Sequence, residues 1–421
     1  MRMRRITKVA ATAAALSLTL AACGGGDSAG DSDSDSLTMA SWHWLEAGRG
    51  DTIYDIVSGF SEENPGFTMN KQEITRADYE KTLSTQFGAG EGPDIFIIPD
   101  TYFPELADAG VLEPLDDVLG DEEQGNLISA TEDFEVDGEQ LGLVWEVSPY
   151  AFFYNEKLLE QAGVEAPTTP EELVAAATAI TEETGKTGFA VRHQMNEEAV
   201  WWLDHSNWEY GFGGEWSDGE NLTINSPENV AAETAFQEVY DSGAFAVGDD
   251  ASTFRSKFAN GEIGMMIDCL TCMRTTLGTS EVLTGEDVGS SKLPFPSDTF
   301  TRVTVGFGIN ANSDNIELAK EFMRWFYSAD VQTELLDANF PSTVGTNVEI
   351  PSKFTDEYPW AAEPLSRIDD TKNALVEGFE LDTPEIRTIV LSHVEEMLTR
   401  GLDPQEALDA AQAEAEAAVG N

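Results

Sequence analysis

Basic residues are scarce in this chain of 421 residues. Only 23 Lys and Arg stand against 78 Asp and Glu, which gives a formal net charge of −55 at pH 7. A surface of this charge repels nucleic acid phosphates and anionic lipid headgroups, so we expect no nucleic-acid partner. Because salt screens such repulsion, the composition favours a protein adapted to a saline exterior, with an ordinary acidic secreted protein as the alternative.

Motifs of catalytic and nucleotide-binding sites are also lacking. The sequence contains no G-x-x-x-x-G-K-[ST], no H-E-x-x-H and no G-x-S-x-G. Residues 306–311, GFGINA, match a dinucleotide fingerprint by letters alone, since no early strand–helix–strand unit surrounds them. The histidines are far apart and lack metal-site spacing: His43, His193, His205 and His393. We expect that the protein binds no cofactor and no metal and is not an enzyme. A glycosidase stays an alternative, because it needs only two carboxylates and these form no recognisable sequence motif.

The chain opens with a basic segment, residues 1–8, and a short apolar run, residues 9–20. This order is typical of a secretory signal, and the run is shorter than the roughly 20 apolar residues that span a bilayer. The following LAAC, which ends at Cys23, resembles a bacterial lipoprotein signal, in which residues 1–22 are removed and the cysteine is lipidated. We expect a flexible tether over residues 23–36 and a lipid anchor on the outer face of the cytoplasmic membrane. Ordinary secretion with a free thiol is the alternative.

The other two cysteines, Cys269 and Cys272, lie in the stretch IDCLTC. An exported protein favours a disulfide between them. A redox pair, metal ligation and free thiols are the alternatives, but two thiols are too few for a zinc site, which takes four ligands.

Strand-like and helix-like patterns alternate from residue 37 onward. Expected strands cover residues 37–44, 67–74 and 94–100, with helices at 52–63 and 77–87 between them. This order predicts a parallel α/β sheet. Later strands are expected at 141–155, 188–193, 263–268 and 303–310, and later helices after Thr169, at 316–328 and after Asp403.

Tryptophans lie close to carboxylates in several places. The stretch SWHWLE carries Trp42, Trp44 and Glu46, and similar neighbours follow at Trp145–Glu146 and Trp201–Trp202. Flat aromatic faces bind the C–H faces of sugar rings, and carboxylates bind their hydroxyl groups. If the first strand continues through SWHWLE, Trp42 and Trp44 share one face, at the end of the strand where α/β folds bind ligands. Burial in the core is the alternative for each tryptophan.

Five stretches together resemble the extracellular solute-binding proteins of bacterial ABC importers, in the carbohydrate-binding group that includes maltodextrin-binding protein. They occur in the family's order, namely GEGPDIFIIPD, ELADAGVLEPL, LGLVWEVSPYAFFYNEKLLEQAGVEAPTTPEEL, FANGEIGMMID and VGFGINANSDNIELAKEFMRWFYSADVQ. The resemblance implies a two-lobed periplasmic-binding-protein fold of α/β class, with discontinuous lobes, hinge strands and a central ligand cleft. It also implies a monomer without catalysis that closes around a sugar and delivers it to ABC permease subunits in the membrane.

The resemblance also implies boundaries within the chain. Lobe 1 is expected over residues 37–146 plus 304–350, and lobe 2 over 147–303 plus 351–421. The first hinge crossing is expected at Val144–Ser148, with the return around Phe300–Val305.

Positions that contact ligand in the family imply a set of binding residues here. They are Trp42, His43, Trp44, Glu46, Asp100, Tyr102, Trp145, Glu146, Tyr150, Trp201, Trp202, Asp268 and Phe307. The sequence departs from the family after FANGEIGMMI, where relatives often have Gly and then Trp, because here Asp268 is followed by Cys269.

Other functions stay open at this stage. The same receptor class also takes glycerol phosphates, for which Arg49, Arg192 and Arg255 are candidates because phosphate favours arginine. An exported glycoside-acting enzyme and a surface adhesion or scaffold protein are the remaining alternatives.

Overall fold

The computed structural model describes residues 36–46 and 49–420. These residues belong to one compact unit, Asp35–Asn421. The predicted signal peptide, the Cys23 anchor and the tether up to residue 35 lie outside the described residues. Among the helices of the described part, none is long and apolar enough to cross a membrane.

A mixed sheet runs through the described part in the order β2-β1-β3-β10-β6-β8-β7. Its strands are β1 Ser36–Ser41, β2 Thr68–Glu73, β3 Ile95–Pro99, β6 Leu143–Asn155, β7 Thr187–Ala190, β8 Ile263–Cys269 and β10 Phe300–Ile309. The expected parallel pairing holds for β1 with β2 and β3 and for β7 with β8. It is wrong for β6 and β10, which pair antiparallel with each other and with β8 and β3.

Short strands pair with the two central strands of this sheet. β9 Val288–Ser291 and β11 Thr343–Val344 pair with β6, and β12 Thr371–Lys372 pairs with β10. A separate hairpin joins β4 Glu135–Val136 to β5 Glu139–Gln140.

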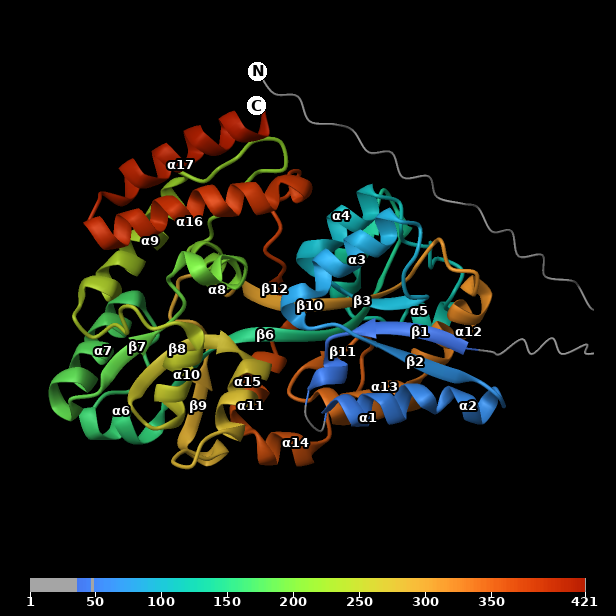
Figure 1. Cartoon of the computed structure of the whole chain (residues 1–421). Coiled ribbons are helices and arrows are strands. Elements are labelled where there is room, and N and C mark those ends of the chain that lie inside the picture. The colour runs from blue at the N-terminus through green and yellow to red at the C-terminus, as the bar shows by residue number, and fades with distance from the viewer. Residues whose placement is uncertain (1–35, 47–48, 421) are drawn as a thin grey trace, which may run out of the picture. The chain divides into compact units, whose positions relative to one another are not determined.

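Seventeen helices are present among the described residues, and local sequence explains several of their ends. The Thr169 side chain accepts a hydrogen bond from the Glu172 N–H at the start of α7, and Gly185 ends α7 at a positive φ of 69°. The helices are α1 Arg49–Ser58, α2 Phe60–Glu63, α3 Tyr79–Gly88, α4 Phe103–Asp108, α5 Asp121–Gln124, α6 Glu156–Ala162, α7 Pro170–Thr184, α8 Glu198–Gly211, α9 Pro227–Asp241, α10 Ala251–Ala259, α11 Leu270–Gly278, α12 Ile316–Phe326, α13 Ala329–Asn339, α14 Ser352–Glu357, α15 Ala362–Leu365, α16 Thr383–Arg400 and α17 Pro404–Val419. Figure 1 shows α3 and α4 above β3 and β10, with α1 and α13 below β1.

The two longest strands, β6 and β10, pair side by side where the hinge crossings are expected. Val147 of β6 lies opposite Thr304 of β10, and a register irregularity follows between Val305 and Gly306. One end of β6 pairs with β10 and β11, while its other end pairs with β8 and β9. A single strand therefore runs from one part of the sheet into the other.

Buried side chains form two clusters, and alternate residues of β6 enter different ones. Phe153 belongs to the cluster that also contains Trp145 and extends to α10 and α11. Phe152 belongs to the cluster formed with α7, α8, α9, α16 and α17. Because successive strand residues point to opposite faces, both clusters pack on β6. The second cluster contains only residues of expected lobe 2, whereas the first contains residues of both expected lobes, so these boundaries stay a prediction.

The first strand is shorter than expected. β1 ends at Ser41, and residues His43–Leu45 form a 3-10 turn. The Ser41 hydroxyl oxygen accepts a hydrogen bond from the His43 N–H, which draws the backbone out of the extended form. The expected alternation of Trp42, His43 and Trp44 across a strand is therefore wrong.

Candidate functional site

A cavity of about 920 Å³ lies beside the paired strands β6 and β10. We call it the hinge cavity. It is lined by residues from distant parts of the chain, namely Trp42, His43, Glu46, Arg49, Thr52, Arg76, Glu146, Arg255, Cys269, Thr271, Cys272, Arg274, Thr275, Val303, Val305, Asp337, Ala338 and Asn339. The ends of β1 and β8 and the helices α1, α10, α11 and α13 supply most of them.

The turn after β1 brings one tryptophan to this cavity and buries the other. Trp42 is half-buried and lines the cavity, with its ring perpendicular to that of Tyr79 and the Arg76 guanidinium 4.9 Å from its ring centroid. Trp44 is only 6% exposed, and its Nε1–H donates to the Met39 carbonyl oxygen at 3.1 Å. Helix α1 approaches this turn closely at Gly50, where a Cβ atom would lie 2.6 Å from the His43 carbonyl oxygen.

Glu146 of β6 is the centre of a charged cluster on the cavity wall. Its Oε1 lies 3.2 Å from His43 Nε2, and its Oε2 accepts a hydrogen bond from Arg49. Arg49 also donates to Glu46 and to the Asn339 side-chain oxygen, both at 2.8 Å. Burial alone would raise the pKa of Glu146, but the nearby Arg49 and His43 outweigh it and hold this pKa at about 2. The Glu146 carboxylate is thus ionised near neutral pH.

Some polar atoms of this cluster have no hydrogen-bond partner among the described residues. They are His43 Nδ1, Arg49 Nε and Asn339 Nδ2, all buried. Unpaired buried polar atoms are costly, and hydroxyl or anionic groups of a ligand can satisfy them.

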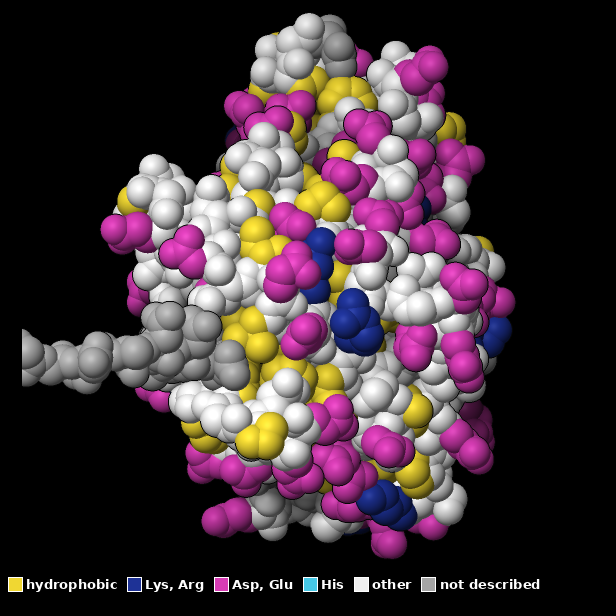
Figure 2. Space-filling view, turned by 90° about the vertical axis from the view of Figure 1, so that its right-hand side faces the viewer, with side chains coloured by type: hydrophobic (Ala, Val, Ile, Leu, Met, Phe, Trp, Pro, Cys, Tyr) yellow, Lys and Arg dark blue, Asp and Glu magenta, His cyan; other side chains and the backbone are white. Residues whose placement is uncertain are grey.

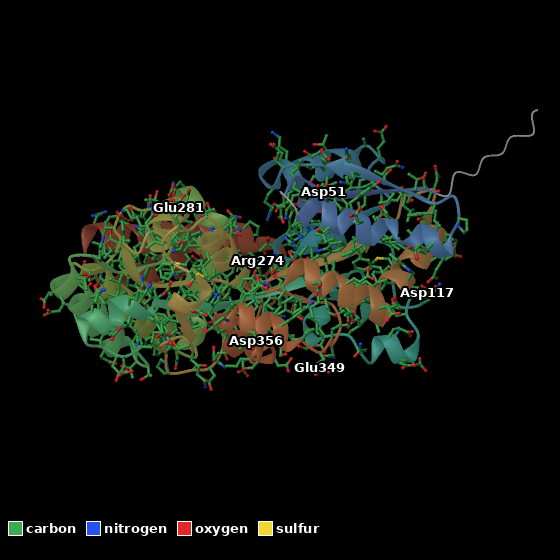
Figure 3. The ribbon with its side chains drawn as sticks, turned by 90° about the horizontal axis from the view of Figure 1, so that it is seen from below. Asp51, Asp117, Arg274, Glu281, Glu349 and Asp356 are labelled. Atoms are coloured by element: carbon green, nitrogen blue, oxygen red, sulfur yellow. A yellow bond between two sulfur atoms is a disulfide. The ribbon has the colours of Figure 1, made fainter. Side chains whose placement is uncertain are left out.

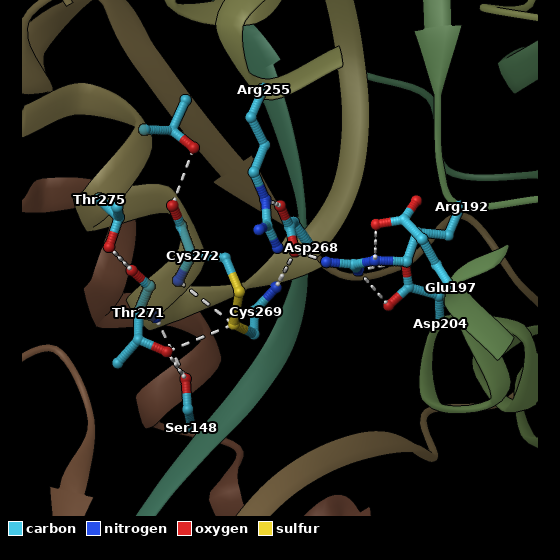
Figure 4. The surroundings of a disulfide bond; sticks show 11 residues. Ser148, Arg192, Glu197, Asp204, Arg255, Asp268, Cys269, Thr271, Cys272 and Thr275 are labelled. Carbon is cyan, nitrogen blue, oxygen red and sulfur yellow. Dashed lines mark hydrogen bonds and ion pairs between the residues drawn. A yellow bond between two sulfur atoms is a disulfide. The ribbon is translucent and has the colours of Figure 1, made fainter. Parts of the chain in front are cut away.

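Another part of the cavity wall is organised by Asp268, at the end of β8 (Figure 4). Its carboxylate accepts hydrogen bonds from Arg255 Nε at 2.6 Å and Nη2 at 2.8 Å. Behind it, Arg192 lies 3.7 Å from Asp268 and donates to both oxygens of Asp204. This buried chain of alternating charges fixes the Arg255 guanidinium at the cavity.

A disulfide joins Cys269 and Cys272 at the start of α11. Both cysteines and Thr271 line the hinge cavity. Thr271 is also bound to β6, because its backbone N–H donates to the Ser148 hydroxyl oxygen at 3.2 Å. The segment after Asp268 is therefore the start of α11, which the disulfide closes and the hydrogen bond to Ser148 ties to β6.

Arginine is concentrated around the hinge cavity. Four arginines line it, against three carboxylates, in a chain in which acidic residues outnumber basic ones more than threefold. Arg274 differs from the other three: it donates to the Phe340 carbonyl oxygen, and the described residues include no ion pair with it. Figure 3 labels Arg274 in the view from below, between Asp51 and Glu281.

Four of the thirteen expected binding residues line the hinge cavity: Trp42, His43, Glu46 and Glu146. The others are buried and do not line it. Trp145 and Phe307 pack around Phe326, with ring centroids 5.0 and 5.3 Å from it. Ligand contact by these buried residues stays a prediction.

Asp100 and Tyr102 are held inside by hydrogen bonds. The Asp100 carboxylate accepts from the Thr304 N–H at 3.2 Å, and burial together with Asp133 raises the Asp100 pKa to about 7. The Tyr102 hydroxyl lies 2.5 Å from Ser84 Oγ.

In the second core cluster, Trp201, Trp202 and Tyr150 are almost fully buried. Trp202 donates to the Ala374 carbonyl oxygen at 2.6 Å and stacks on Trp216. Asp268 does not line the cavity itself but holds Arg255 there.

Sequence reasoning missed Arg76, Arg274 and Asn339. The phosphate alternative names Arg49 and Arg255 from the sequence, and both line the cavity. The rarity of arginine in so acidic a chain was the one signal that could have found the arginines. Asn339 lies at the end of α13, and no local pattern marks it.

A second cavity, of about 650 Å³, has the opposite character. Seven of its lining residues are carboxylates: Asp108, Glu132, Asp133, Glu135, Glu215, Glu377 and Glu380. Its one basic residue, Lys372, is paired with Glu215. An anionic solute therefore suits the hinge cavity better than this one, whereas the aromatic residues and carboxylates that bind a neutral sugar line both cavities.

Comparisons with known proteins agree on one family. The family model of the bacterial extracellular solute-binding proteins matches residues 44–333. A putative binding protein of Brucella abortus is 29% identical over 227 residues, covering 52% of this chain and 55% of that protein, so the chain spans about half the length of this relative. An sn-glycerol-3-phosphate-binding periplasmic protein of Agrobacterium fabrum is 23% identical over 403 residues, covering 87% of this chain and 89% of that protein.

Among solved structures, a cyclic alpha-maltosyl-1,6-maltose binding protein of Arthrobacter globiformis superposes with a TM-score of 0.78. The alignment covers 91% of this chain and 98% of that one at 20% identity. The expected two-lobed fold is confirmed by this likeness.

Proposed function

Because the chain belongs to the bacterial extracellular solute-binding protein family, we propose that it is the receptor of an ABC importer and binds a sugar in the hinge cavity. The receptor is anchored through a lipid on Cys23 and delivers the sugar to permease subunits in the membrane. It performs no chemistry on the sugar, because recognition and closure are all that delivery requires.

The observation that carries this proposal is the polar wall around Glu146. Trp42 offers an aromatic surface for a sugar ring, while Glu146, Arg49 and Asn339 offer fixed donors and acceptors beside it. Unpaired buried atoms of His43, Arg49 and Asn339 face the same cluster and suit hydroxyl groups. The proposal gains further support from the cavity's position beside β6 and β10.

Ligand binding closes the receptor by hinge motion at β6 and β10. The lobes are those expected from the sequence, 37–146 plus 304–350 and 147–303 plus 351–421. A ligand that contacts both walls of the cavity stabilises the closed form over the open one, because it makes all its contacts only in the closed form.

The four cavity arginines favour a second candidate, a small polyol phosphate such as a glycerol phosphate. Arg274 carries this alternative, because a guanidinium on the cavity wall without a carboxylate partner suits a phosphate group. A neutral sugar carries no negative charge and does not need an arginine without a carboxylate partner.

A thermal-shift screen of a form beginning at Gly24 tests both candidates. Mono- to tetrasaccharides and glycerol phosphates are compared at low and high salt. A ligand at 100 times its dissociation constant stabilises the protein by about 2.7 kcal/mol, which raises the melting temperature measurably. A rise with neutral sugars that persists in Arg274→Gln supports the sugar receptor. A rise with glycerol phosphates that is lost in Arg274→Gln supports the second candidate.

Arg324→Gln is the matched control, since Arg324 also donates to a backbone carbonyl oxygen but does not line the cavity. It should leave every ligand response unchanged. No rise with any sugar or phosphate would contradict the receptor proposal.

A further inference from the structure

Three ligand-type side chains meet inside the second core cluster, away from the hinge cavity. His205 and Glu209 lie four residues apart on α8, and Glu233 lies on α9. His205 Nε2 lies 2.7 Å from Glu233 Oε1 and 3.4 Å from Glu209 Oε1. All three side chains have an exposed fraction of 0%. The cluster thus combines an imidazole and two carboxylates in a site closed to solvent.

The carboxylates of this cluster are under-satisfied. Both oxygens of Glu209 and Oε2 of Glu233 are buried without a hydrogen-bond partner among the described residues. The ring centroids of Trp201, Phe236 and Trp216 lie 5.8, 5.5 and 6.2 Å from that of His205, so the surroundings are largely apolar. Two carboxylates in such surroundings are very unfavourable unless positive charge offsets them. Burial alone would lower the pKa of His205, but Glu209 and Glu233 outweigh it and raise this pKa to about 9, so without a metal the imidazolium offsets only one of the two carboxylates.

We propose that His205, Glu209 and Glu233 bind one divalent transition-metal ion, with zinc as the best fit. A dication beside one neutral imidazole and two carboxylates gives a site of zero net charge. Imidazole nitrogen and carboxylate oxygen are both zinc ligands, and three protein ligands leave a fourth tetrahedral position open.

One of the two separations from His205 Nε2 already matches such a site. Zinc–ligand distances of roughly 2.0–2.2 Å at tetrahedral angles place ligand atoms about 3.4 Å apart. The 3.4 Å between His205 Nε2 and Glu209 Oε1 matches this separation. The 2.7 Å between His205 Nε2 and Glu233 Oε1 is shorter, so Glu233 must retreat by a fraction of an ångström.

Sequence spacing alone did not point to this site. The pattern from His205 to Glu209 places both residues on one face of a helix, but the third ligand comes from another helix and histidines elsewhere take no part. The ion would fasten α8 to α9. None of its ligands lines the hinge cavity, so the site is separate from the proposed solute site.

Metal analysis of the purified full chain tests the proposal. The protein is loaded with zinc and then dialysed in high salt. The salt removes zinc ions that bind weakly and nonspecifically to the acidic surface. We expect one equivalent of zinc by mass spectrometry, a fall in melting temperature on chelation, and recovery when zinc is returned. Cobalt in place of zinc should give the visible absorption bands of a tetrahedral site.

Glu233→Gln keeps a hydrogen-bond acceptor for His205 and should weaken zinc binding at least about tenfold, since even changes around a metal's ligands cost 10- to 100-fold. His393→Gln is the matched control, because His393 pairs with Glu414 at 2.9 Å in a solvent-accessible position. It should leave the zinc content at one equivalent.

Two results would overturn the proposal. If the folded wild-type protein binds no stoichiometric zinc and cobalt gives no visible bands, the three side chains are protonated and joined by hydrogen bonds instead of by a metal ion. If Glu233→Gln binds zinc as tightly as the wild type, the ion is an adventitious one on the acidic surface.

Discussion

His43 Nε2 lies 3.2 Å from Glu146 Oε1, and this contact joins the turn after β1 to the strand that runs through both parts of the sheet. Glu146 also holds Arg49 at the start of α1. One carboxylate therefore organises a wall of the hinge cavity and ties it to the expected hinge crossing.

Replacing Glu146 by Gln should destabilise the protein. The change leaves Arg49 without its buried partner, and breaking a buried ion pair costs about 3–5 kcal/mol. The pKa of Glu146 is about 2 in the folded protein and near 4.5 in the unfolded chain. Its contribution to the free energy of unfolding is therefore complete above about pH 4.5 and is lost as the pH falls through about 2. Urea unfolding at pH 7 and at pH 3 to 4 measures the loss.

Glu46→Gln is the control for that prediction. Glu46 also pairs with Arg49, but its side chain is 38% exposed, so the expected loss is below about 1 kcal/mol. Equal losses in the two variants would contradict the central role of Glu146.

Trp42 and Trp44 should respond differently to replacement by alanine. Trp44→Ala empties a buried site and breaks the bond to Met39, so the free energy of unfolding should fall by about 3–5 kcal/mol. Trp42→Ala should cost less stability, because Trp42 is half-buried, but should remove the ligand-induced rise in melting temperature. Urea unfolding without ligand and thermal shift with ligand separate these effects. The prediction fails if Trp44→Ala abolishes the ligand response while keeping wild-type stability.

Sequence patterns located most of the secondary structure because the relevant signals are local. Thr169 and Gly185 bound α7 as expected, and the apolar stretch 94–100 contains β3. The pattern failed after Ser41, where one side-chain hydrogen bond ends the strand and separates Trp42 from Trp44. Strand alternation cannot foresee that competition.

The site was harder to predict because its contacts are long-range. Arg49 and Asn339 are 290 residues apart and meet only in the folded chain. Tryptophan near carboxylate, the pattern used from the sequence, also describes the buried core around Trp202 and Trp145. Aromatic residues fill both cores and ligand sites, so composition alone does not separate them.

Asp100 should make stability fall as pH rises. Burial raises its pKa to about 7, well above the 3.8 of an ordinary aspartate, so the folded state binds this proton more tightly than the unfolded state. The contribution of Asp100 to the free energy of unfolding is therefore complete below about pH 4. A few kcal/mol of this contribution are lost between about pH 4 and 7. Asp100→Asn should flatten this part of the curve of unfolding free energy against pH. Asp117→Asn, at an exposed carboxylate bound to Lys320, is the control and should leave the slope unchanged.

Low salt should destabilise the protein through repulsion between its carboxylates. Figure 2 shows a face on which Asp and Glu side chains far outnumber Lys and Arg, in keeping with the net charge of −55. Screening shortens the range of repulsion from about 10 Å at 0.1 M salt to about 3 Å at 1 M, so the melting temperature should rise over this range.

The triple variant Glu281→Gln, Glu349→Gln and Asp356→Asn removes three exposed charges that are labelled in Figure 3. It should melt higher than the wild type at low salt and at the same temperature at 1 M, because screening at high salt removes the repulsion that the variant relieves. Chloride salts of sodium and choline should act alike if screening is the cause. A melting temperature that is flat across the salt series would remove the inference of a saline habitat, since the acidic surface would then impose no cost that salt relieves.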